Sequence, residues 1–146
     1  MKALLLSAAI CVAGLPGAAE GWGNLDALLF SHLTRSGNAE ASYWLPNSID
    51  PAQATAAFGV VYEHIAGSAG NTTIAVGLFL RPSGGQWGFA GPVADLFGHN
   101  PRDVVFEGGF AMMTTTMPGP NDPRCCPTVP TRWRIDLARL QAWQAR

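Results

Sequence analysis

The sequence predicts an α+β domain that is mainly an antiparallel β-sheet, with about five to six short strands and one N-terminal helix. Three observations carry this prediction. Short apolar and β-branched segments recur along the chain, turn residues separate them at hairpin spacing, and one segment near the N-terminus has helical periodicity. A small open β-barrel or a β-sandwich is the alternative arrangement of the same strands.

The predicted helix spans 24–33. Its leucines recur at the three- and four-residue spacing of one helix face, and Asn24 is a favourable N-cap. The helix is expected to end before Ser36-Gly37-Asn38 and to dock its apolar face on another element. Turn residues further along the chain leave 41–45 as a short strand.

Segment 54–65 is interpreted as a strand, although Gly59 lies in its middle and its alternation is weak. A helix beginning at Asp50-Pro51 is the alternative, because Asp is a good cap and Pro suits the first helical turn. Segments 72–81 and 86–93 then flank a turn at 82–85, and they are the clearest hairpin in the sequence.

Two further strands are expected at 103–107 and 110–117, because Gly108-Gly109 between them suits a tight turn. Residues 97–101 are expected to interrupt the sheet before them. Segment 131–137 alternates apolar and charged residues, which is typical of a half-buried strand. The final residues, 138–146, are expected to form a helical turn or a frayed tail.

Residues 1–19 have the features of a secretory signal peptide, with Lys2 before an apolar run and Gly17-Ala18-Ala19 at the expected cleavage site. The run is too short to span a bilayer. Cys11 lies inside it, and Ile10 before it is a poor neighbour for lipid attachment. We therefore expect a single small β-rich globular domain over 20–146, soluble in the periplasm or secreted.

Removal of the signal would leave eight arginines against ten acidic residues, a formal charge of −2. This mild negative balance argues against nucleic acid as a partner. The absence of lysine after Lys2, together with abundant alanine, glycine and proline, is typical of a GC-rich bacterial genome. We expect the partner to be an envelope protein or a glycan.

The adjacent cysteines Cys125 and Cys126 are the only thiols that remain after 1–19 is removed. Neighbouring α-carbons lie about 3.8 Å apart, less than the roughly 4.4–6.8 Å of most disulfides, so a closed bridge needs a local turn. Pro123 and Pro127 flank the pair and can supply it, and an oxidising compartment favours closure. The alternatives are two reduced structural thiols, or thiols used in metal or redox chemistry.

The segment Asp122-Pro123-Arg124-Cys125-Cys126-Pro127-Thr128, followed by a strand centred on Trp133, resembles a signature of uncharacterised secreted bacterial proteins and lipoproteins. In those proteins an Asp-Pro-x-Cys-Cys-Pro-Ser/Thr sequence lies near the C-terminus. The resemblance covers the last third of the chain, and it extends more loosely to the hairpin at 74–89. It implies export and a compact β-rich domain, but no activity.

Soft metal ligands occur before the cysteines, and thioethers and thiolates are ligands that monovalent copper prefers. The candidates are Met112, Met113, Met117, Cys125 and Cys126, with His64 and His99 as additional donors. Met112 and Met113 would point to opposite faces of one strand, and methionine commonly fills gaps in a core. The sequence therefore predicts no metal site and no cofactor, with copper handling as the alternative.

No spacing of histidine with acidic residues demands a catalytic pair, and Glu63 and His64 would face opposite sides of a strand. The sequence therefore names no catalytic residue and favours a non-enzymatic role. Exposed aromatic residues often anchor partners or saccharides. Trp87 and Trp133 are expected in the core, whereas Trp22 and Trp143 are expected at the surface. The expected function is an interaction or accessory module of the cell envelope, with metal or thiol-redox handling as the alternative.

Overall fold

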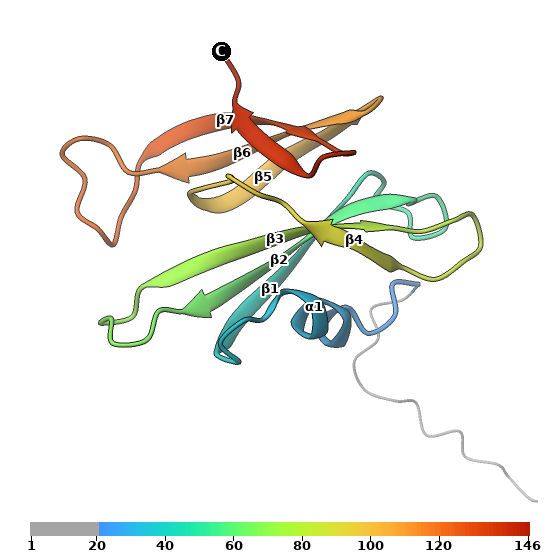
Figure 1. The fold of residues 1–146 in the computed structure, drawn as a ribbon, viewed down its shortest axis with the longest axis horizontal. Helices are drawn as coiled ribbons and strands as arrows, with labels where there is room; N and C mark the ends of the chain where they lie inside the picture. The colour runs from blue at the N-terminus through green and yellow to red at the C-terminus, as the bar shows by residue number, and fades with distance from the viewer. Residues whose placement is uncertain (1–20) are drawn as a thin grey trace, which may run out of the picture.

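Two antiparallel four-stranded sheets stack face to face in the computed structural model, and one helix covers the outer face of the first sheet (Figure 1). The structure describes residues 21–146. The predicted signal peptide 1–19 and Cys11 lie outside the described residues. The predicted α+β class with one N-terminal helix is confirmed, and the two stacked sheets have the sandwich-like arrangement that was the alternative.

The first sheet has the order β1-β2-β3-β4 and the second has the order β5-β6-β7-β8. The helix α1 is Leu25–Leu33, with Asn24 as its N-cap, as predicted. The strands are β1 Ala39–Pro46, β2 Ala56–His64, β3 Thr72–Leu80, β4 Gly88–Pro92, β5 His99–Glu107, β6 Phe110–Met117, β7 Val129–Asp136 and β8 Gln141–Gln144. Residues 21–146 thus contain eight strands, more than the five to six expected.

The strand interpretation of 54–65 is confirmed by β2, and the alternative helix at Asp50-Pro51 is absent: the Asp50 carbonyl accepts from the N–H of Gln53 and Ala54 in a turn, and the chain continues into β2. Two local predictions were wrong. Residues 99–101 belong to β5 because His99 pairs with Thr116 and Arg102 with Thr114, and a bulge with a positive φ at Asn100 accommodates the extra residue between them. The C-terminal segment forms β8, since it pairs along β7 instead of coiling.

The main core lies between the two sheets. Alternate residues of β2 and β3 point into it and meet alternate residues of β6 and β7, as the pleat of a strand requires. Its buried members include Phe58, Val60, Val76, Leu78, Ala111, Met113, Trp133 and Ile135. The predicted inward side of 131–137 is therefore confirmed, with Trp133 3% exposed.

A second, smaller core lies between α1 and the outer face of the first sheet, and it explains the weak alternation of β2. Gly59 and Gly77 are directly paired across β2 and β3. A Cβ at Gly77 would lie 2.8 Å from the Leu33 side chain and 2.7 Å from the Phe89 ring. A Cβ at Gly59 would overlap Leu29 in the same way. The glycine pair is thus the surface on which the helix rests.

One hydroxyl satisfies two polar groups inside the main core. Thr115 is fully buried on β6. Its Oγ1 accepts from Trp133 Nε1 at 2.7 Å and donates to the Phe97 carbonyl at 2.7 Å. These two hydrogen bonds tie β7 and the segment between β4 and β5 to the middle strand of the second sheet, because an unpaired buried polar group is costly.

Candidate functional site

The first half of β3 has a free edge because β4 is short. β4 pairs with β3 only over Gly77–Leu80. After Pro92, the Val93 N–H donates to the Val76 carbonyl, and the chain then crosses to the second sheet, where Ala94 pairs with Gln141. Within the described part of the chain, no strand pairs with residues 72–75 on that side.

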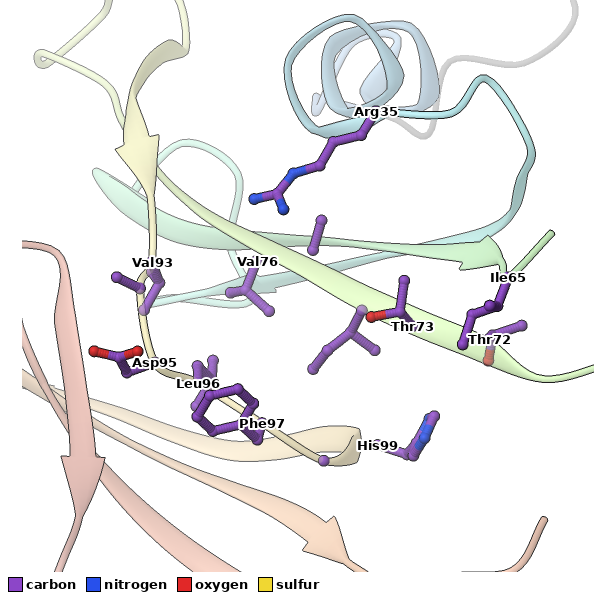
Figure 2. Close-up of a pocket in the computed structure, with 14 residues that line it drawn as sticks. Arg35, Ile65, Thr72, Thr73, Val76, Val93, Asp95, Leu96, Phe97 and His99 are labelled. Atoms are coloured by element: carbon purple, nitrogen blue, oxygen red, sulfur yellow. The ribbon is translucent and has the colours of Figure 1, made fainter. Parts of the chain in front are cut away.

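A cleft of about 380 Å³ lies along this free edge. Residues 72–76 of β3 form one side, the crossing segment 93–99 forms another, and Arg35 reaches in from the loop after α1 (Figure 2). Phe97 is 56% exposed there. The cleft therefore combines unpaired backbone, an exposed aromatic ring and a guanidinium group.

A second cleft, of about 480 Å³, shares Ile65, Thr72 and His99 with the first. It lies between the β2–β3 turn and the loop that holds Arg124 and Cys125. Because the two clefts share these lining residues, we treat them as one groove, which runs from Arg35 past His99 to the cysteine loop. We call it the β3 groove.

Arg35 is positioned by a buried carboxylate. Glu63 is only 4% exposed, and its Oε1 accepts from Arg35 N at 2.8 Å, Ser36 N at 3.0 Å and Ser36 Oγ at 3.1 Å. Burial raises the pKa of Glu63, but these hydrogen bonds from Ser36 and Arg35 outweigh it and hold the pKa below its ordinary value. An ionised Glu63 thus fixes the loop that carries Arg35.

We expect Glu63→Gln to lower the free energy of unfolding by about 1 kcal/mol at pH 7, because neutral hydrogen bonds replace charge-assisted ones. The pKa of Glu63 is lower when folded than its ordinary value of 4.5, so the ionised group stabilises the fold above that pH. This contribution is lost as the pH falls through the folded pKa. Urea unfolding from pH 3 to 7 should therefore show that the difference in free energy of unfolding between wild type and Glu63→Gln becomes smaller as the pH falls.

Glu107→Gln provides the matched control for this series, since Glu107 is exposed at the end of β5. It should follow the wild type at every pH. A gap between wild type and Glu63→Gln that persists unchanged at pH 3 would contradict the role given to the ionised form.

Tyr62 and His99 connect the two sheets beside the groove. The Asn100 N–H donates to Tyr62 Oη at 2.8 Å, and the His99 ring stacks on Tyr62 with the centroids 6.4 Å apart. Burial raises the pKa of the Tyr62 phenol, against the lowering effect of the Asn100 N–H. Tyr62 therefore stays protonated at neutral pH and acts as a fixed polar link between the layers.

The loop 118–128, which we call the cysteine loop, joins β6 to β7 and borders the end of the groove that lies away from Arg35. The sulfur atoms of Cys125 and Cys126 are bonded to each other across a Cα–Cα distance of 3.8 Å. Both residues are exposed, and the Cys126 N–H donates to the Pro123 carbonyl at 3.0 Å. The local turn that the flanking prolines were expected to supply is thus present.

The Asp122 carboxylate closes the base of this loop. It accepts from Gly119 N and Thr128 N, each at 2.7 Å, and from Thr128 Oγ1. The Gly119 N–H, and then the Thr128 hydroxyl and N–H, hold the pKa of Asp122 below its ordinary value. The Asp and Thr of the signature thus have a structural role, which is to hold the two ends of the loop together.

The soft ligands considered for copper do not gather in one place. Met113 is fully buried between the sheets, and Met117 packs at the edge of the same core. Met112 points to the opposite face, where it lines a shallow cleft with Trp143. Among residues 21–146, no group of three or more histidine, cysteine or acidic side chains is placed to hold a metal ion.

The remaining candidates are distributed over the surface. His64 Nδ1 lies 3.3 Å from Glu40 Oε1, while Glu63 faces the loop after α1, so the two neighbours point apart as expected. Trp143 is 42% exposed, as predicted. Trp22 and Trp87 are both half-buried and stack on each other with centroids 6.2 Å apart, so the exposure expected for Trp22 was wrong, whereas Trp87 packs against the second core.

No family model matches the chain. No curated protein matches it, and no solved structure does. Within residues 21–146, no helix has the length and apolar character that crossing a bilayer requires.

Sequence reasoning missed the residues that make the groove, above all Arg35 and the free edge at 72–75. It predicted hairpin arms at 72–81 and 86–93, in which the second arm would have covered most of the first. Pro92 was the available local signal, because proline has no N–H to donate to a neighbouring strand and β4 ends at this residue. Arg35 gave no signal, since only tertiary packing brings it to β3.

Proposed function

We propose that this chain is an exported cell-envelope domain that acts as a non-enzymatic interaction module and binds its partner in the β3 groove. Export would follow from the signal peptide expected at 1–19. The observation that carries the proposal is the groove itself. In it, the first half of β3 pairs with β2 on one side and leaves its other edge free between Arg35 and the exposed ring of Phe97.

The composition of the groove supports binding of a partner. Ile65 and Phe97 are 43% and 56% exposed, and both border the groove, where a partner could bury them. Among the described residues, no salt bridge holds Arg35, although its charge also lowers the pKa of Glu63, and its guanidinium group reaches into the groove. Burial of apolar surface would supply affinity, and the charge would orient the partner.

Photo-crosslinking in the native host tests the proposal. A benzoylphenylalanine residue replaces Thr73, which is exposed beside the groove, or Tyr43, which is 54% exposed on β1. We expect a discrete crosslinked product from position 73 and none of the same mass from position 43. Mass spectrometry then identifies the adduct as an envelope protein or a glycan. Identical products from both positions, or none from position 73, would contradict the proposal.

Thiol chemistry at Cys125 and Cys126 is the second candidate function, because both residues are exposed and Cys125 borders the groove. Alkylation followed by intact-mass measurement distinguishes a structural disulfide from thiols that are used in chemistry. For a purely structural bridge, we expect no label on the native protein and two labels after reduction. A protein taken from cells with both thiols labelled, or with a mixture of states that shifts with the medium, would favour redox or copper handling.

A further inference from the structure

We propose that the β3 groove binds an extended peptide segment of a partner protein, which adds to the first sheet as a strand beside residues 72–75. The inference rests on the proposed function of the groove and names the class of partner. The added strand would occupy the position that β4 would hold if it did not leave the sheet at Pro92.

The hydrogen-bond register shows which groups of β3 are free. The Ile65 N–H donates to the Asn71 carbonyl, so odd-numbered residues of β3 pair with β2. The Val76 carbonyl accepts from Val93 on the other side, so even-numbered residues point away from β2. Thr72 and Ile74 therefore present their N–H and C=O groups to the groove. Four residues of strand offer an edge of about 13 Å.

The outer edges of β1, β5 and β8 carry features that block strand addition, whereas the edge at residues 72–75 does not. β1 has a bulge between Ala39 and Ala41 and ends in Pro46. β5 has two register shifts and positive φ values at Asn100 and Asp103. β8 has four residues, and Ala94 forms a bridge to it.

By contrast, β3 keeps an unbroken register with β2 over its whole length. Residues 72–75 are Thr-Thr-Ile-Ala, without charge or proline. Such a flat, regular and unpaired edge is a ready template for another strand. Sheet edges of this kind bind extended peptides through main-chain hydrogen bonds, with pockets for alternate side chains.

The walls of the groove specify the side chains of the peptide. Side chains of an added strand would alternate between the side of Arg35 and the side of the crossing segment. The first side offers a guanidinium group, and the second offers Leu96 and the exposed Phe97 ring. The geometry therefore points to a segment in which acidic residues alternate with apolar ones.

Amide hydrogen exchange measured by NMR tests strand addition directly. The probes are linear twelve-residue peptides selected from a random phage library on the processed protein. In the free protein, the amides of Thr72 and Ile74 should exchange fast and those of Thr73 and Ala75 slowly. A bound peptide should slow Thr72 and Ile74 selectively. Selected peptides should share the alternation of acidic with apolar residues.

A matched pair of proline variants supports the assignment. Thr72→Pro removes an N–H that faces the groove. Ser42→Pro removes an N–H on the outer edge of β1, since the Asn47 N–H donates to the Ala56 carbonyl and odd-numbered residues of β1 therefore bond to β2. We expect Thr72→Pro to weaken peptide binding by about tenfold, the effect of about one lost hydrogen bond. Ser42→Pro should bind as the wild type does. Arg35→Gln should weaken acidic peptides selectively.

Several outcomes would overturn strand addition. They are the enrichment of no peptide, peptides that leave Thr72 and Ile74 unprotected, and equal effects of the two proline variants. Concentration-dependent protection of the same amides without peptide would assign the edge to a second copy of this chain. If crosslinking from position 73 succeeds but no peptide protects these amides, the groove binds a folded surface, and only the present inference fails.

Discussion

Replacing Gly59 with valine is expected to lower the free energy of unfolding by about 1–3 kcal/mol, the usual cost of forcing extra methyl groups into a packed core. Valine favours strands, so the expected sign is opposite to its intrinsic propensity. A side chain at position 59 would overlap Leu29 and Phe79, which are 1% and 0% exposed. The helix would have to lift from the sheet. Urea unfolding followed by circular dichroism measures the loss.

Gly88→Ala is the control for this experiment. Gly88 also lies in a strand, but the nearest atom to a Cβ there is the Leu80 carbonyl oxygen at 3.7 Å, an ordinary contact. This substitution should leave stability unchanged or raise it slightly, because alanine restricts the unfolded chain. Equal losses at positions 59 and 88 would show that helix contact does not explain the glycine on β2.

The second large effect is expected for Thr115→Val. Valine has nearly the shape of threonine but cannot hydrogen-bond, so Trp133 Nε1 and the Phe97 carbonyl both lose their partner. Leaving the buried Trp133 Nε1 unsatisfied costs about 1–3 kcal/mol and the part-buried Phe97 carbonyl adds less, so we expect a total loss of about 2–4 kcal/mol. Urea unfolding monitored by the tryptophan fluorescence of the protein measures it.

Thr131→Val on β7 is the comparison, because Thr131 is half-buried and its hydroxyl makes only a local bond of 3.3 Å to the Val129 carbonyl. Its stability should change by less than about 0.5 kcal/mol, as is usual for surface substitutions. A Thr115→Val protein as stable as Thr131→Val would show that the buried hydroxyl does not link the second sheet to the crossing segment.

Thr115 also connects stability to the groove. Phe97 and Gly98 belong to the crossing segment that forms one wall, and a Cβ at Gly98 would lie 2.6 Å from Thr115 Oγ1. The close approach fixes the backbone of this wall against β6. Thr115→Val should therefore weaken binding in the β3 groove as well as stability.

Local patterns were sufficient for most elements. The leucine spacing and Asn24 predicted α1, and Gly108-Gly109 predicted the turn between β5 and β6. The alternation around Trp133 predicted which side of β7 is buried. These features depend on neighbours along the chain, and hydrophobic periodicity and turn chemistry report such neighbours directly.

The sequence by itself determined the fold class, the helix, the hairpins and the turn at the adjacent cysteines, because each depends on residues close together in the chain. Only the tertiary structure decided that the strands divide into two stacked sheets, that Gly59 faces Gly77 beneath α1, and that β4 leaves half of β3 unpaired. The physical reason is that residues 72–75 have a free edge only because β4 does not extend beside them. Which strand lies there is set by packing between distant segments.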